Sequence, residues 1–340
     1  MKMHPILKEN EYILKETNLD IWRKNKYTGK NIHVVIFDKL ASPHEFLKPQ
    51  VIAPFCPKAT ISHGTNVASV IAQFSECKIT MLSNTNECRE YFKQIADTVD
   101  IVNISMSADK SLAEHNWGFL EQYDLPIFVS SGNDGDDELN YPSAFNWTIS
   151  VGAYSKDRIA DYSNYSNLLD CVGYTDVYVL NSEKQSFKFN GTSCSSPQVV
   201  SIFTHYAQFI KDNYNRKVAR QEAFDFVHNN CVETKETEKD GYGLFVLSKE
   251  IPIIEKIIIP ILEINSTPKK LWRCQANAFS QKSNAEAYQQ VLKEKGYNSY
   301  IVFINGLYKC QLNAFSLEAN ARSFSQKLKD EGVNNFIVYY

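Results

Sequence analysis

The sequence lacks an apolar run long enough to cross a bilayer and lacks a long run of like charge. The most apolar stretch, 251–264, is interrupted by Pro252, Pro260 and charged residues, and is too short for a membrane span. The first residues lead into a charged amphipathic segment and not into the apolar core of a secretory signal. We therefore expect synthesis in the cytoplasm. A net charge of −3 without a basic run argues against nucleic acid and anionic membranes as partners.

The sequence also lacks the cysteine spacing that is typical of metal-binding sites. The eight cysteines are scattered, without a CxxC pair and without regular Cys/His spacing. This pattern argues against a zinc site and against a dense disulfide framework. We expect mostly free thiols, no metal and no cofactor.

The length and composition predict a soluble globular protein. A chain of 340 residues, of which 44% are hydrophobic, can bury a substantial core and is long enough for one large domain and a smaller one.

Up to about residue 151, short apolar strands alternate with amphipathic helices. The first segment, 11–25, has helical spacing and precedes a continuous β-branched run at 32–37. Repeated βα units of this kind predict a parallel sheet with helices on both faces, an αβα sandwich. The further strands are expected at 78–82, 100–106, 126–131 and 147–151, and the further helices at 66–74, 87–96 and 111–123.

After this alternation the pattern predicts a hairpin, 177–180 with 185–189, which leads to the stretch Asn190-Gly191-Thr192-Ser193. A long apolar helix, 198–210, follows, so the Ser193 hydroxyl is expected at a helix N-terminus. Unpaired N–H groups and the helix dipole there favour an oxyanion. Taken alone, however, a serine in this position is more often only a helix cap.

Two other residues supply partners for Ser193. Asp38 ends the strand at 32–37, and His63 opens the helix at 66–74. In parallel α/β folds the carboxyl ends of strands form the active-site edge. Asp38, His63 and Ser193 therefore allow a hydrolytic triad of carboxylate, general base and nucleophile.

At this point the sequence resembles the subtilisin-like serine proteases. The resemblance is carried by Gly191-Thr192-Ser193-Cys194-Ser195-Ser196-Pro197 and by His63-Gly64-Thr65-Asn66-Val67-Ala68, and it spans roughly 20–250. It implies a serine endopeptidase with Ser193, His63 and Asp38 as triad, and with Asn133 as the side-chain donor of the oxyanion hole. Segments that would pair with the substrate backbone contribute Ser105, Met106, Ser107, Ser131 and Gly132.

The sequence also departs from that family. Lys39-Leu40 stands where the family has a small hydroxyl residue and glycine, and the calcium-binding loop after the histidine is missing. We therefore expect no calcium site at that loop. We also expect no long propeptide before the domain. The departures leave open a second hypothesis, a pseudoprotease that acts as a binding or regulatory protein. Cys194, beside the nucleophile, is expected to be a packing residue, although its closeness to Ser193 predicts sensitivity to bulky thiol reagents.

The last seventy residues contain an internal duplication. Residues 271–304 align with 307–340 at a constant offset of 36, without a gap. Each copy has the pattern strand, helix, glycine turn, strand, which predicts a βαββαβ domain with one four-stranded sheet.

This duplicated segment resembles the SPOR domain, a bacterial module that binds peptidoglycan. The resemblance implies that polar side chains on the open sheet face contact glycan strands, although an ordinary solvated sheet face is equally compatible with the pattern. Strand alternation assigns to that face Arg273, Gln275, Asn277, Lys309, Gln311 and Asn313, and turns Cys274 and Cys310 toward the helices.

We thus expect a peptidase domain at 1–250, a connector at 251–268 and a ferredoxin-like, SPOR-like domain at 269–340. The substrate would be a protein or peptide near peptidoglycan. Because a wall-binding module acts outside the membrane, we expect synthesis in the cytoplasm and action at the cell wall or spore after lysis.

Overall fold

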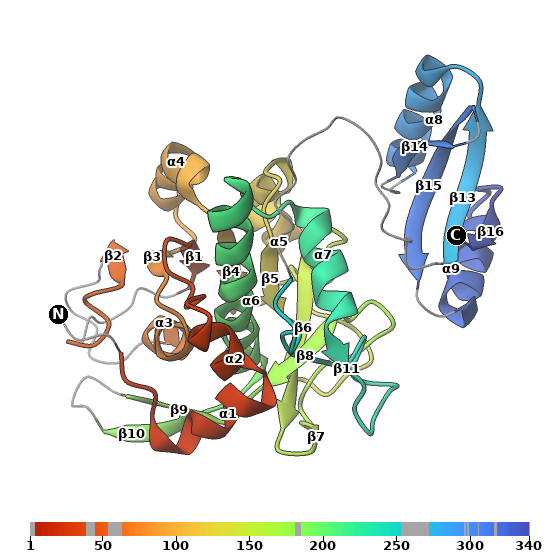
Figure 1. Ribbon diagram of the computed structural model, residues 1–340. Coiled ribbons are helices and arrows are strands. Elements are labelled where there is room, and N and C mark those ends of the chain that lie inside the picture. The colour runs from red at the N-terminus through yellow and green to blue at the C-terminus, as the bar shows by residue number, and fades with distance from the viewer. Residues whose placement is uncertain are drawn as a thin grey trace. The chain divides into compact units, whose positions relative to one another are not determined.

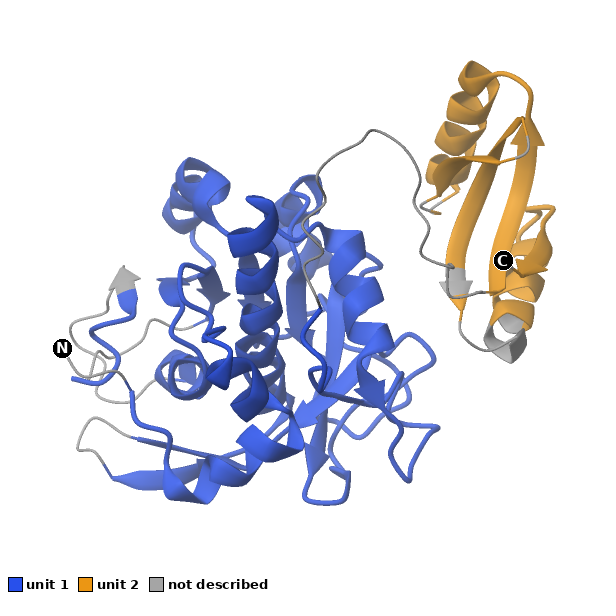
Figure 2. Ribbon diagram, in the orientation of Figure 1, with its two compact units in different colours: residues 1–255 blue, residues 256–340 orange. Residues whose placement is uncertain are grey.

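A computed structural model describes residues 4–38, 45–53, 63–180, 185–252, 272–295, 297, 299–304, 306–315 and 318–339. By its internal contacts the chain divides into two compact units, 1–255 and 256–340 (Figure 2). Most of the expected connector, 253–268, lies outside the described residues, as do Lys39 and Leu40.

The first unit is built on a ten-stranded sheet that is parallel through its centre (Figure 1). Its strand order is β11-β12-β8-β6-β5-β4-β1-β3-β2, and β7 pairs with β6. The strands are β1 (His33–Phe37), β2 (Val51–Ala53), β3 (Lys78–Leu82), β4 (Ile101–Ile104), β5 (Ile127–Ser130), β6 (Ile149–Ser155), β7 (Arg158–Ile159), β8 (Cys171–Tyr174), β11 (Cys231–Val232) and β12 (Leu244–Phe245). A separate hairpin joins β9 (Val177–Leu180) to β10 (Ser186–Phe189).

Helices cover both faces of this sheet, as the sequence predicted. Residues of β1 alternate between two cores: Val34 and Ile36 belong to one, whereas Val35 and Phe37 belong to the other. Such alternation buries both faces of a strand and requires a three-layer arrangement. The helices are η1 (Lys8–Asn10), α1 (Glu11–Glu16), α2 (Leu19–Lys24), α3 (His63–Phe74), α4 (Asn86–Ile95), η2 (Ala96–Thr98), α5 (Lys110–Trp117), η3 (Gly118–Gln122), α6 (Thr192–Tyr214) and α7 (Arg220–Asn229).

Several boundaries differ from the sequence prediction. The expected helix at 11–25 is two short helices, because Asn18 adopts a left-handed conformation with φ of 59° between them. The expected helix at 111–123 changes to a 3-10 helix at Gly118. The two-residue strands β7, β11 and β12 were not predicted, since segments this short carry no periodic signal.

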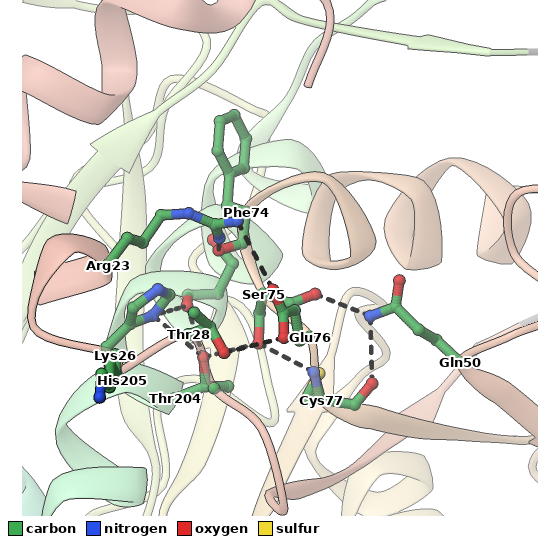
Figure 3. A network of polar contacts seen from close by, with 12 residues as sticks. Arg23, Lys26, Thr28, Gln50, Phe74, Ser75, Glu76, Cys77, Thr204 and His205 are labelled. Carbon is green, nitrogen blue, oxygen red and sulfur yellow. Dashed lines mark hydrogen bonds and ion pairs between the residues drawn. The ribbon is translucent and has the colours of Figure 1, made fainter. Parts of the chain in front are cut away.

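The central helix α6 is the main packing element of this unit. Residues from Thr192 to Ile210 are buried almost without exception. Near its middle, Thr204 Oγ1 donates to Ser75 Oγ at 2.8 Å, as Figure 3 shows. Both oxygens lie close to Gly29, where an added Cβ would approach them to 2.1–2.6 Å. Gly29 therefore permits the close approach of the N-terminal segment to α3 and α6.

The second unit has the expected βαββαβ order. Its elements are β13 (Trp272–Phe279), α8 (Lys282–Glu294), β14 (Tyr300–Ile304), β15 (Leu307–Phe315), α9 (Glu318–Asp330) and β16 (Phe336–Tyr339), and the sheet order is β14-β15-β13-β16. Cys274 and Cys310 are buried toward the helices, where their thiols donate to the carbonyls of Ala321 and Ala285. The seven cysteines in the described part of the chain are free thiols.

Within the described residues, none of the helices combines the length and apolar character that a bilayer crossing requires.

Candidate active site

Three candidate residues follow the carboxyl ends of adjacent parallel strands. Asp38 comes directly after β1, Ser105 directly after β4, and Asn133 three residues after β5. The sheet order β5-β4-β1 makes these strands neighbours. Because the strands are parallel, the three residues gather at one edge of the sheet, which is where α/β folds place their active sites.

Asp38 and His63 are in direct contact. His63 Nδ1 lies 3.0 Å from Asp38 Oδ1 and 2.8 Å from Oδ2. Asp38 is 2% exposed, and its backbone N–H donates to the carbonyl of Leu82 on β3. The carboxylate is therefore buried at the edge of the sheet. With Nδ1–H donating to it, the neutral imidazole has its lone pair on Nε2.

His63 opens α3, as the sequence predicted, and its side chain is about one-third exposed. Its ring meets the ring of Phe189 edge-to-face at a centroid distance of 5.6 Å. Phe189 ends β10, just before the Ser193 turn. The imidazole thus lies between the buried carboxylate and the segment that carries the serine.

Ser193 lies in the first turn of α6 and is partly exposed. Its hydroxyl donates to the carbonyl of Ser105 at 3.3 Å. In this arrangement the Ser193 hydroxyl donates to the residue that follows β4, and not to His63. A nucleophile–base hydrogen bond that forms only in a substrate complex is common in hydrolases.

The start of α6 is fixed to β4 by side chains that the sequence analysis did not identify. Ser196 Oγ donates to Asn103 Oδ1 at 2.8 Å, and Asn103 Nδ2 donates to Ser105 Oγ at 3.0 Å. Asn103 and Ser196 are fully buried. A buried polar pair of this kind specifies one register between helix and strand, and it thereby fixes the distance from Ser193 to the sheet edge.

Asn133 is exposed, and hydrogen bonds to its side-chain oxygen fix the orientation of its amide group. Its Oδ1 accepts hydrogen bonds from Thr192 N at 2.8 Å and from Thr192 Oγ1 at 3.1 Å. Because the oxygen is occupied, Nδ2 is the group that can donate to a further ligand. The backbone N–H of Ser193 belongs to the first turn of α6 and has no acceptor within the helix. The two groups are donors suited to an oxyanion.

The expected substrate-binding residues lie in two segments at this edge. Ser105 and Ser131 are buried, Gly132 is buried, Met106 is partly exposed, and Ser107 is exposed. Ser131 N donates to Val151 O, which continues the β5–β6 pairing. Side chains of Met106 and Ser107 are therefore the ones in these segments that solvent reaches.

Cys194 is fully buried, and burial raises the pKa of its thiol to about 12. A buried neutral thiol reacts poorly, since the thiolate is the nucleophile. The expected sensitivity to bulky thiol reagents is therefore wrong for the folded protein at this residue. The expectation that Cys194 is a packing residue is confirmed, since it belongs to the hydrophobic core.

In the second unit, the expected glycan-contact residues do not form one regular row. Gln275 and Gln311 pair in register and are 3% and 1% exposed, so their amides are covered. Arg273 Nη1 donates to the Tyr300 hydroxyl at 2.8 Å. Strand irregularities interrupt the β13–β15 pairing after Arg273 and after Gln275. The simple alternation therefore does not continue to Asn277.

The remaining three residues keep some exposure. Asn277 and Asn313 are exposed, and Lys309 is partly exposed. Asn313 has a φ of 24°, as expected of an irregular position and not of a regular strand. The prediction that Gln275 and Gln311 present solvated amides is wrong, because both residues are buried.

No group of three or more His, Cys, Asp or Glu side chains that could hold a metal ion occurs in the described part of the chain.

Comparison with known proteins gives two family matches. The model of the Subtilase family matches residues 56–243, more than half of the chain, and the model of the SPOR domain matches residues 268–339. The first match contains His63, Asn133 and Ser193 and begins after Asp38.

Relatives with named activities are similar to a large part of this chain. The intracellular serine protease of Paenibacillus polymyxa is 25% identical over 269 residues, which cover 67% of this chain and 82% of the relative. The major intracellular serine protease of Bacillus subtilis is 26% identical over 247 residues, 60% of this chain and 77% of the relative.

Solved structures share the fold. A lanthipeptide protease superposes with a TM-score of 0.57 at 18% identity, covering 72% of this chain and 97% of that one. A cold adapted subtilisin-like serine proteinase gives 0.55 at 17% identity, with coverage of 65% and 90%. At these identities the likeness supports the architecture alone.

Proposed function

Because the chain belongs to the Subtilase family of serine proteases and carries a SPOR domain, we propose that it cleaves peptide bonds with the triad Ser193, His63 and Asp38. The observation that carries this proposal is the contact of the buried Asp38 carboxylate with His63 Nδ1 at 2.8 Å, at the strand edge where Ser193 lies.

The proposed reaction begins when the Ser193 hydroxyl turns from the Ser105 carbonyl to His63 Nε2. His63 takes the proton while Ser193 Oγ attacks the scissile carbonyl, and it returns the proton to the leaving amine. Asp38 holds the imidazole in the required tautomer and stabilises its charged form. A water molecule then hydrolyses the acyl-enzyme by the same proton transfers.

The tetrahedral intermediate carries a negative oxygen, which in this proposal lies between Asn133 Nδ2 and the Ser193 N–H. Each donor stabilises charge that develops only during the reaction. The bonds from Thr192 to Asn133 Oδ1 support this role, since they leave the NH₂ group as the outward donor.

We propose that an extended substrate pairs with the backbone of 105–107 and of 131–132. Strand addition gives affinity through main-chain hydrogen bonds, and side-chain pockets give specificity. Met106 and Ser107 are then the residues that a substrate side chain meets.

Labelling with a fluorophosphonate probe tests the nucleophile. The folded wild type should form an adduct on Ser193, and the Ser193→Ala variant should form none. A wild-type protein that remains unlabelled after folding is verified by circular dichroism would favour the pseudoprotease hypothesis instead. A proteomic cleavage profile against the same variant would then define the sequence preference.

We further propose that the SPOR domain binds peptidoglycan and that the natural substrate is a protein or peptide near the wall. The family match supports this, as do the partly exposed cations Arg273 and Lys309, which suit the polar groups of a glycan. The full-length Ser193→Ala protein, which cannot digest itself, should sediment with amidase-treated peptidoglycan. Failure to sediment would reject wall binding and favour a protein-interaction module.

We propose synthesis in the cytoplasm and action at the wall or spore after lysis. Two relatives bear names that describe them as intracellular proteases, and a further relative from Bacillus subtilis is named a cell wall-associated protease. Fractionation of growing and lysing cultures tests this: the protein should reach the wall fraction only when cells lyse, and secretion from intact cells would contradict it.

A further inference from the structure

The turn before Ser193 is held by a closed set of hydrogen bonds from outside α6. The N–H of Gly191 donates to the Tyr162 hydroxyl at 3.0 Å. The carbonyl of Gly191 accepts from Thr175 Oγ1 at 3.2 Å. The two side-chain oxygens, Tyr162 Oη and Thr175 Oγ1, are 3.1 Å apart. One peptide group on each side of Gly191 is thus bound by a side chain.

The direction of each hydrogen bond follows from the donors available. The Gly191 N–H can only donate, and the single hydroxyl hydrogen of Thr175 goes to the Gly191 carbonyl. Tyr162 must therefore accept from Gly191 and donate its own hydrogen to Thr175. The three groups form a ring in which every bond points the same way round, and bonds in such a chain polarise and strengthen one another.

The ring lies directly before α6, whose N-cap residue cannot cap the helix with a side chain. Gly191 is the N-cap residue of α6, has a φ of 93° and has no side chain to cap the helix. N-terminal N–H groups normally gain an acceptor from a capping side chain of the same turn. Here Thr192 N donates to Asn133 Oδ1 instead, and the N–H of Gly191, two residues before Ser193, donates to the Tyr162 hydroxyl.

The same segment also holds the loop that carries Asn133. The backbone carbonyl of Tyr162 accepts from Gly135 N at 2.9 Å. Asn164, which is 1% exposed, accepts from Asp134 N at 2.7 Å and from Gly135 N at 3.0 Å through its Oδ1. Tyr162 therefore contacts both segments of the candidate oxyanion site, one through its carbonyl and one through its hydroxyl.

We propose that Tyr162 is a positioning residue that fixes the spacing between the Asn133 side-chain amide and the Ser193 N–H. This inference rests on the proposed function, since it matters only if those two donors bind one oxyanion. Both donors must lie 2.7–3.1 Å from that oxygen, and a misplacement of about 1 Å can cost about 10² in rate. Burial raises the pKa of Tyr162, which keeps its hydroxyl able to donate.

The first test compares Tyr162→Phe with the matched control Tyr165→Phe. Both variants lose one hydroxyl in the same segment. The aromatic ring of Tyr165, however, lies with its centroid 4.6 Å from Lys239 Nζ, and its hydroxyl is not part of the hydrogen-bonded ring at Gly191. On a fluorescent casein substrate, Tyr162→Phe should lower kcat about tenfold, a loss smaller than that of an oxyanion donor itself. KM should change less than twofold, and fluorophosphonate labelling should slow by a similar factor.

A second pair of variants keeps the inference testable if Tyr162→Phe does not fold. Thr175→Val breaks the ring at a residue that is 1% exposed, whereas Thr175→Ser retains the hydroxyl. We expect Thr175→Val to lower kcat as Tyr162→Phe does, and Thr175→Ser to restore most of the loss. A thermal melt accompanies each variant, so that a loss of kcat is measured on folded protein.

The outcomes separate this inference from the proposed function. If wild type is not labelled at Ser193, the proposed function fails and this inference with it. If wild type is labelled and Tyr162→Phe keeps the wild-type kcat, the positioning role alone is rejected. The positioning role would also be rejected if Tyr165→Phe lost as much kcat as Tyr162→Phe. The same holds if Thr175→Ser lost as much kcat as Thr175→Val.

Discussion

Asp38 contacts His63 through both carboxylate oxygens, at 3.0 and 2.8 Å from Nδ1. The carboxylate side chain is 1% exposed, whereas the histidine side chain is 34% exposed. The acid is thus a buried acceptor at the edge of the sheet, and the imidazole is accessible to a substrate. This difference in exposure suits an orienting group and a proton carrier respectively.

The Asp38→Asn substitution tests the orienting role. An amide can donate to Nδ1 and so favour the wrong tautomer, in which Nε2 carries the hydrogen and cannot act as a base. We expect kcat to fall about 10⁴-fold, with little change in thermal stability. Kinetics on a peptide substrate, with a melt of the same preparation, measure both quantities. A loss below tenfold would show that Asp38 is not the orienting acid.

The triad residues should act as a unit. Ser193→Ala and His63→Ala each remove the same proton-transfer step, so the double variant should be no slower than either single variant within a few-fold. Initial rates for the three proteins under one set of conditions give the comparison. Additive losses would mean that Ser193 and His63 serve independent roles.

Asn133→Ala tests the oxyanion donor. The substitution removes Nδ2 and leaves the Thr192 N–H without its 2.8 Å acceptor. We expect kcat to fall by about 10² to 10³ with KM nearly unchanged, because the interaction strengthens only in the transition state. A variant that changed KM and kept kcat would place Asn133 in ground-state binding instead.

The sequence was sufficient for those residues that stand at the ends of regular elements. Asp38 follows a β-branched run, and His63 and Ser193 open helices, so periodicity and position indicated all three. Tyr162 and Thr175 could not be found in this way. From loops, their hydroxyls bind residues that are distant in the sequence, and loop residues have no periodic pattern that would predict a partner.

The second unit shows a different limit of sequence reasoning. The duplication correctly indicated the βαββαβ order and the burial of Cys274 and Cys310. It did not indicate that Gln275 and Gln311 are covered, because the pairing irregularities of β13 arise from two strands together and not from either one alone. Strand alternation therefore turned Cys274 and Cys310 correctly toward the helices, but it did not predict the burial of the two glutamines or the irregular pairing before Asn277.

Cys194 should be inert in the folded protein. Its side chain is fully buried, and burial raises the pKa of the thiol to about 12. Iodoacetamide at neutral pH should modify Cys194 only after denaturation, as peptide mass spectrometry can measure. Cys88, which is partly exposed, serves as the internal control because it should react in the native state. Rapid native modification of Cys194 would contradict the burial.

Two buried histidines predict that acid weakens the fold. Burial lowers the pKa of His4 to about 4 and that of His205 to about 3, whereas the unfolded chain titrates near 6.5. Between these values the unfolded state binds protons that the folded state does not, so the free energy of unfolding falls as pH falls below about 6.5. Above that pH both states are neutral at these residues, and the two histidines contribute no pH dependence.

Urea unfolding at pH 7 and pH 5 measures this loss of unfolding free energy. In a His205→Gln variant, whose side chain does not titrate, the difference between the two pH values should shrink; an unchanged difference would show that His205 is not the group responsible.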